Sequence, residues 1–259
     1  MEGKKPGYDS GRPKEGEIDM DWGIFYGVGV GPGDPEMLTM KAARVLEEVD
    51  VLFIPKSAQE KRSLAYSIVK DTINKNWEIK ELLLPMTRNR EELEQHWQAG
   101  AEKVARVLRE GRNAAFITLG DPTIYSTFTY LLKKLKGLEP QVKIEIIPGI
   151  SSINFIAANL KQPLVEGEED LVIVTGLRDK ASLAGLIQQF DNVVVLKAGN
   201  QLDKLIEIVK ESKMPLHYYF ASRCGFPDAI LSEEIDVIAQ TQQDYLSTMI
   251  IKKAGEEKA

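Results

Sequence analysis

The sequence is poor in cysteine and histidine, and this scarcity limits the chemistry open to the 259-residue chain. The one cysteine, Cys224, excludes an internal disulfide framework. No CxxC pair or histidine-rich tract has the spacing of a structural metal site, so we expect no bound metal. His96 falls on a polar part of a predicted helix and His217 in a predicted strand. We therefore name no catalytic acid or base from the sequence.

Long apolar runs are also absent. No uninterrupted apolar stretch is long enough to span a bilayer, and the N-terminus lacks a basic start followed by an apolar segment. We therefore expect a soluble, cytoplasmic protein without a membrane partner. The net charge of -6 disfavours a general nucleic-acid binder, so no nucleic-acid partner is predicted.

What is present is an ordinary globular composition, with 43% hydrophobic and 28% charged residues. Residues 1–20, MEGKKPGYDSGRPKEGEIDM, contain almost nothing to bury, and we interpret them as a disordered extension. From Trp22, the segment WGIFYGVGVGPGDPEMLTMKAARVLEEVDVLFIP predicts a strand, a glycine-rich loop, a helix and a second strand over 51–54 that Pro55 ends. This βαβ unit implies a parallel sheet.

The pattern continues with helices over 64–74 and 90–110, the second stopped by Gly111, and with strands before Pro85 and before Gly120. A turn-rich stretch at 136–141 is taken as a domain boundary. It divides the chain into an N-terminal α/β domain at 21–138 and a C-terminal one at 142–259. The predicted fold class is α/β, with a largely parallel first sheet, a mixed second sheet and a cleft between the domains.

Three strands end in unusual turns, at 27–35, 119–127 and 147–152. Ligands of open α/β sheets collect at such carboxyl ends, where helix N-termini leave N–H groups unpaired. The glycine loop has two interpretations: a dinucleotide site, or a tight turn in which Asp34 caps a helix and Pro35 begins it. Asp121 likewise either caps a helix beginning at Pro122 or holds a ligand.

The repetition of Gly-Asp-Pro at two strand ends favours a ligand. A carboxylate accepts hydrogen bonds from an ammonium group or a ribose hydroxyl, while nearby N–H groups bind a carboxylate. A zwitterionic nucleoside such as S-adenosylmethionine uses both.

Together, GVGPGDPEMLTMKAARVLEEVDVLF, GDPTIYSTFTYL and IPGISS resemble the tetrapyrrole (corrin/porphyrin) methylase family over nearly everything after Asp21. VLFIPKS, LLLPMTRNREELEQHW and IIPGISSINFIAANL resemble, within it, the C-20 methyltransferases of cobalamin biosynthesis that act on precorrin-2 or cobalt-factor II. The resemblance implies two α/β domains, S-adenosylmethionine in the trough between them, and a homodimer.

Carried over by motif, the resemblance implies cofactor contacts from three loops and two strand ends. These are Pro32, Gly120, Asp121, Ile124, Ser151, Ser152, Leu196 and Ala221. Leu196 departs from relatives that place methionine there. Tyr26 and Tyr125 border the cleft in one interpretation and serve packing in the other.

An acidic tetrapyrrole substrate needs cations. Our candidates are Lys56, Arg88 and Arg90, with Arg62 and Arg223 behind them; ordinary solvated charge is the simpler alternative. Two other functions stay open: a tetrapyrrole methylase with another ring position or uroporphyrinogen III as substrate, and a nucleotide-binding module without chemistry.

Overall fold

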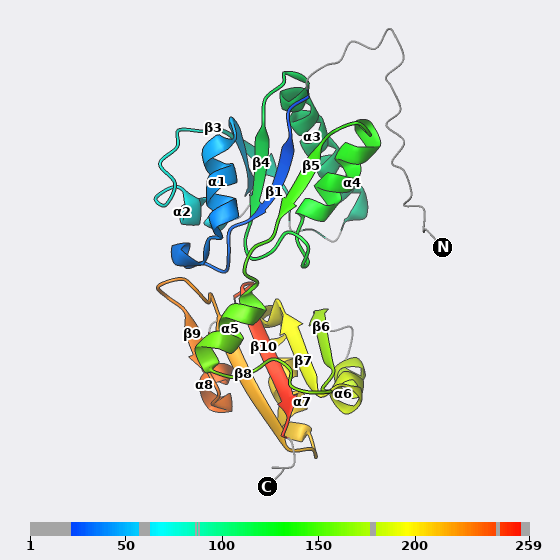
Figure 1. Ribbon diagram of the computed structural model, residues 1–259. Helices are drawn as coiled ribbons and strands as arrows, with labels where there is room; N and C mark the ends of the chain where they lie inside the picture. Colours follow the sequence, from blue (N-terminus) through cyan, green and yellow to red (C-terminus); the bar gives the residue numbers. More distant parts are fainter. Residues whose placement is uncertain are drawn as a thin grey trace, which may run out of the picture.

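The computed structural model describes residues 22–56, 63–85, 87, 89–176, 180–241 and 244–254, which fold into two five-stranded sheets, one above the other in Figure 1. The expected disordered extension at 1–20 lies outside these residues. No helix in the described ranges is long and apolar enough to cross a membrane.

The first sheet is entirely parallel, with strand order β3-β2-β4-β1-β5. Its elements are β1 (Phe25–Gly29), the 3-10 helix η1 (Pro35–Met37), α1 (Met40–Glu48), β2 (Val51–Lys56), α2 (Leu64–Val69), β3 (Glu78–Leu83), α3 (Arg90–Arg109), β4 (Ala114–Thr118), α4 (Phe128–Leu138) and β5 (Ile144–Ile147). Helices α1 and α2 cover one face, and α3 and α4 the other (Figure 1). Because both faces are covered, the central strands β1 and β4 are continuously buried.

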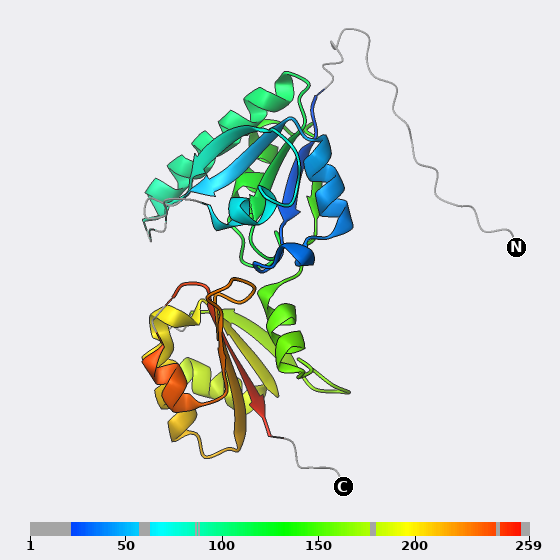
Figure 2. The ribbon, with the colours of Figure 1, turned by 90° about the vertical axis from the view of Figure 1, so that its left-hand side faces the viewer.

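The second sheet is mixed, with strand order β6-β7-β10-β8-β9. Its elements are α5 (Ser152–Leu160), β6 (Leu171–Thr175), α6 (Lys180–Gln189), β7 (Asn192–Leu196), the 3-10 helix η2 (Ala198–Gln201), α7 (Leu202–Glu211), β8 (Leu216–Ser222), β9 (Ile230–Ser232), α8 (Ile235–Gln240) and β10 (Ser247–Lys253). Among its neighbouring strand pairs, β6–β7 is parallel and the other three are antiparallel. Helix α5 packs on one face, and α6 and α7 pack on the other (Figure 2). The two-domain α/β fold predicted from the sequence is confirmed.

The expected boundary at 136–141 falls before the last strand of the first sheet. Strand β5 follows that stretch and pairs with β1 from Phe25↔Ile144 to Val28↔Ile147. The chain therefore passes from the first sheet to the second at 148–151, just before α5. Composition located the nearest loop, but the pairing of β5 with a strand more than a hundred residues earlier is not a local property.

Pro55 does not end β2, contrary to our expectation. The strand continues to Lys56, and Pro55 lies opposite Leu82 of β3. Pairing between β2 and β4, in contrast, stops at Phe53↔Phe116. Proline lacks the backbone N–H that a second ladder requires, so this part of β2 is paired on one side only.

Three glycines bring the turns after β1, β4 and β5 into backbone contact. A Cβ atom built on Gly29 would lie 2.5 Å from the Gly120 oxygen and 2.7 Å from the Gly149 nitrogen. A Cβ atom on Gly149 would lie 2.2 Å from the same oxygen. The Gly120 nitrogen also donates to the Gly31 oxygen over 2.7 Å. No side chain fits at Gly29 or Gly149, where the three turns meet.

We predict that Gly149→Ala lowers the free energy of unfolding by about 1–3 kcal/mol, because the new methyl group displaces backbone rather than a flexible side chain. Urea unfolding followed by circular dichroism measures the change. The matched control is Gly137→Ala in α4, where a Cβ atom meets nothing within 4 Å. This control should gain about 0.5–1 kcal/mol, and equal stability changes in the two variants would contradict the steric argument.

Candidate functional site

A pocket of about 640 Å³ lies between the two domains. The first domain contributes the ends of β2, β3 and β4, the loop after β1 and the loop at 119–127. The second contributes the N-terminus of α5, the end of β7, residues 223–226 and the start of β10. Strand ends and helix N-termini therefore meet here, as in other open α/β sheets that bind ligands.

Seven of the eight predicted cofactor residues line this pocket: Pro32, Gly120, Asp121, Ile124, Ser151, Ser152 and Leu196. The eighth, Ala221, is only 1% exposed and belongs to the core of the second domain. Thr248, which pairs with both Leu196 and Ala221 across the sheet, lines the pocket in its place.

Asp121 is not the cap of a helix that begins at Pro122. Helix α4 begins only at Phe128, after the turn at 121–127. The Asp121 Oδ1 atom accepts hydrogen bonds from the backbone N–H and the hydroxyl of Thr123, and Oδ2 accepts from the Gly149 N–H over 3.0 Å. This buried carboxylate thus ties the β4 loop to the crossing between the domains.

The other Asp-Pro pair follows the simpler interpretation. Asp34 caps the 3-10 helix η1, its Oδ1 atom accepts from the Glu36 N–H over 2.9 Å, and Pro35 is the first residue of that helix. The two sequence-identical tripeptides therefore have different structural roles, one within its own turn and the other between loops.

Backbone strain is concentrated around the pocket. Four non-glycine residues among those described have positive φ, and three of them, Tyr125 (48°), Lys197 (58°) and Arg223 (50°), line it. Bulky residues rarely occupy this region, which costs roughly 1–3 kcal/mol, and such residues often mark functional sites. The pocket is thus held by unusual backbone on both domains.

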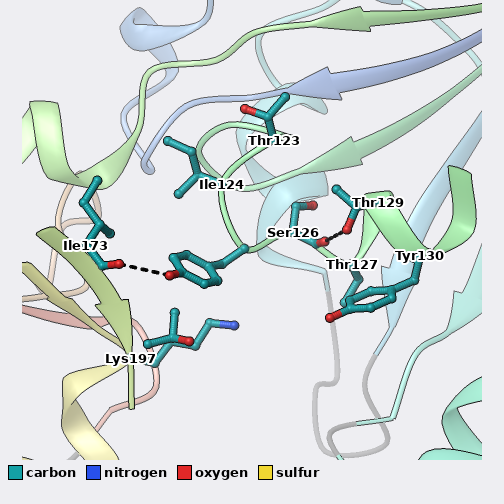
Figure 3. A pocket seen from close by; sticks show the side chains of 10 residues that line it. Thr123, Ile124, Ser126, Thr127, Thr129, Tyr130, Ile173 and Lys197 are labelled. Atoms are coloured by element: carbon teal, nitrogen blue, oxygen red, sulfur yellow. Dashed lines mark hydrogen bonds between the residues drawn. The ribbon is translucent and has the colours of Figure 1, made fainter. Parts of the chain in front are cut away.

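Tyr125 links the domains directly. Its hydroxyl donates to the Ile173 carbonyl of β6 over 3.0 Å, and this bond is the dashed line at the left of Figure 3. A second pocket of about 570 Å³ shares Tyr125, Lys197 and other lining residues with the first. The Tyr125 side chain therefore borders two adjoining spaces. Tyr26, the other tyrosine considered from the sequence, is buried in the core.

Not all of the cations predicted to bind the substrate line the pocket. Lys56 lines the pocket but forms an ion pair with Glu81 at 2.6 Å. Arg90 is exposed at the first turn of α3 and is not among the lining residues. Arg62 and Arg88 lie outside the described residues.

Arg223 also lines the pocket, but its Nε atom donates to Asp228 over 2.6 Å and its guanidinium lies 3.6 Å from Asp244. The hydrogen bond from Arg223 lowers the pKa of Asp228. Arg223 is therefore paired with two carboxylates, and its hydrogen bond keeps the Asp228 carboxylate ionised at neutral pH.

Sequence reasoning missed the segment Tyr245–Thr248 and Lys197. Strand β10 runs antiparallel to β7 and β8, so its beginning lies at the edge where those strands end. The other lining segments are turns that follow strands and carry glycine or capping signals, whereas a segment that precedes a strand carries no such signal. The positive φ of Lys197 could not be predicted from the residue either, because lysine rarely adopts this conformation.

The lining suits a ligand with both apolar and charged parts. Pro32, Ile124 and Leu196 offer apolar surface, while Asp121 and the hydroxyls of Thr118 and Ser151 are polar. The volume falls within the range of ordinary small-molecule sites. These residues fit an adenosine and an amino-acid group bound together. The described residues hold no cluster of three metal-binding side chains.

The chain belongs to the tetrapyrrole (corrin/porphyrin) methylases, whose family model matches residues 25–235. It is 42% identical over 231 residues to a probable cobalt-precorrin-2 C(20)-methyltransferase of Methanocaldococcus jannaschii, covering 88% of this chain and 95% of that protein. It is 28% identical to the cobalt-precorrin-2 C(20)-methyltransferase of Salmonella typhimurium, covering 90% and 98%. The family predicted from the motifs is confirmed.

Solved structures share the fold at low identity. A cobalt precorrin-4 methyltransferase has a TM-score of 0.68 at 17% identity, with 89% of this chain and 94% of that chain covered. A Thermus thermophilus uroporphyrin-III C-methyl transferase complexed with S-adenyl homocysteine has a TM-score of 0.58 at 21% identity, covering 89% and 97%. These likenesses extend to the arrangement of both domains.

Cys224 gives a test of burial at the pocket wall. Burial raises the pKa of its thiol to about 11, so the reactive thiolate is scarce at pH 8. We predict that a disulfide reagent reacts about a hundredfold more slowly with the native protein than with the unfolded chain, and that the native rate rises tenfold per pH unit up to pH 10. Rapid labelling of native protein at pH 8 would show an exposed or activated thiol instead.

Proposed function

We propose that this protein is an S-adenosylmethionine-dependent C-methyltransferase that methylates C-20 of precorrin-2 or of its cobalt-containing counterpart in cobalamin biosynthesis. The observation that carries the proposal is the similarity, over 88% of the chain, to a relative named for this reaction. A Sinorhizobium relative named for precorrin-2 without cobalt is 30% identical over 192 residues. The state of the metal in the substrate is therefore part of the test.

The pocket supplies positioning. When bound, S-adenosylmethionine provides a methyl group made electrophilic by a positively charged sulfur. Asp121 and the hydroxyls of Ser151 and Ser152 would hold the polar end of the cofactor, and Ile124 and Leu196 would exclude water beside it. Neither His96 nor His217 lines the pocket. The lining residues named above would therefore contribute by aligning the cofactor and excluding water.

The proposal also includes a homodimer, an inference that rests on the family resemblance. Equilibrium sedimentation at micromolar concentration tests it directly. A single species at the 29.0 kDa of one chain would remove the dimer from the proposal.

The activity is tested in two steps. Calorimetric titration with S-adenosylhomocysteine measures cofactor binding, and anaerobic turnover with precorrin-2 and with cobalt-precorrin-2 measures methyl transfer. NMR of the product locates the new methyl group. Methylation at C-20 supports the proposal, and transfer to another ring position makes the protein a different methylase of the family. Tight binding of adenine nucleotides with no transfer to any tetrapyrrole would favour a binding module.

We predict that Asp121→Ala weakens S-adenosylhomocysteine binding by about 1.5–3 kcal/mol, the range for hydrogen bonds to a charged group. The same change frees the Gly149 N–H and should lower the melting temperature. The matched variant Thr123→Val removes the hydroxyl that donates to Asp121 while leaving the carboxylate in place. Unchanged affinity together with reduced stability in Asp121→Ala would assign Asp121 to loop anchoring alone.

A further inference from the structure

We propose that Lys197 binds a carboxylate side chain of the substrate, and that the pocket of about 570 Å³ beside Tyr125 receives that side chain. The inference rests on the proposed function, because it assumes an acidic tetrapyrrole in the cleft. It adds a specific residue and a specific space for one part of that substrate.

Lys197 differs from the other described cations of the cleft because they form ion pairs with carboxylates. Lys56 is held by Glu81, and Arg223 by Asp228 and Asp244. No carboxylate of the described residues forms an ion pair with Lys197. Its ammonium lies 4.9 Å from the centre of the Tyr245 ring, a contact with a neutral face that leaves the N–H donors available.

The backbone directs this ammonium into the cleft. Lys197 occupies the left-handed region between the end of β7 and the start of η2. The turn that follows packs against the backbone at Asp244, because a Cβ atom on Gly199 would overlap the Asp244 backbone carbonyl oxygen. Figure 3 shows the Lys197 side chain extending from the second domain into the pocket, towards the side lined by Thr127 and Tyr130. A strained backbone that holds a half-buried cation, with no carboxylate partner in the described part of the chain, is a preformed anion site.

The pocket around Lys197 is lined by hydroxyls. Four threonines, one serine and two tyrosines join Lys197 and two isoleucines, and no acidic residue is among them. Several hydroxyls already have partners; the Tyr125 hydroxyl, for example, donates to Ile173. Those of Thr127, Thr175 and Tyr130 make no hydrogen bond to the described residues. One ammonium and free hydroxyl donors match the acceptors of a carboxylate and its short alkyl arm.

The test compares two lysines of the same backbone conformation. Lys197→Met removes the proposed ligand. Lys161→Met is the matched control, because Lys161 also has positive φ, at 56°, but is exposed at the end of α5 and lines neither pocket. Lys197→Arg keeps the charge. We expect the KM for the tetrapyrrole to rise about tenfold in Lys197→Met, to rise less in Lys197→Arg and to stay unchanged in the control.

Two further measurements separate this role from others. S-adenosylhomocysteine affinity should be unchanged in Lys197→Met, and a loss there would place Lys197 in the cofactor site and overturn the inference. The KM of the native protein should rise with salt more steeply than that of Lys197→Met. A lowered melting temperature with unchanged KM would mean that Lys197 only packs on Tyr245, which also overturns it.

Binding of uroporphyrin, an acidic tetrapyrrole, separates this inference from the proposed function. Fluorescence quenching gives its affinity without methyl transfer. Weaker binding by Lys197→Met than by Lys161→Met supports the carboxylate site even if the native protein methylates no corrinoid. Equal binding and equal KM in the two variants overturn the site while leaving the methyltransferase assignment intact.

Discussion

The arrangement of the whole molecule depends on one backbone contact, where the turns after β1, β4 and β5 meet at Gly29, Gly120 and Gly149. No side chain separates these turns, so the two loops of the first domain and the crossing to the second are fixed against one another. Asp121 strengthens the same junction by accepting a hydrogen bond from the Gly149 N–H. This contact fixes the crossing between the domains, and the Tyr125–Ile173 hydrogen bond joins the domains at a second point.

The cleft built on that junction differs on its two sides. Around Asp121, Ser151 and Leu196, polar groups and apolar surface alternate at strand ends, which suits a compact zwitterionic cofactor. Beside Tyr125, hydroxyl side chains and Lys197 line the same pocket, which suits an acidic group. Tyr125 borders both spaces and its hydroxyl donates to the Ile173 carbonyl, so one side chain both joins the domains and lines the two pockets.

Local sequence patterns predicted much of this. Periodicity located most helices and strands, and the three turns at 27–35, 119–127 and 147–152 all reached the site, because each carries its own glycine or capping signal. Properties that depend on distant pairing were missed. Strand β5 belongs to the first sheet through β1, and the start of β10 enters the pocket because that strand is antiparallel to its neighbours. Lys197 was missed because its place at the pocket depends on a left-handed backbone conformation, which residue type does not reveal.

Pro55 has a consequence for the size of the site. The ladder between β2 and β4 stops at Phe53, so the two strands are free to diverge before their ends. Pro55, Lys56, Thr118 and Leu119, which follow that point on the two strands, all line the pocket. A residue with an N–H at 55 would have a donor with which to extend the ladder and draw the strands together. The first sheet therefore opens onto the pocket at Pro55, the residue of β2 that has no backbone N–H.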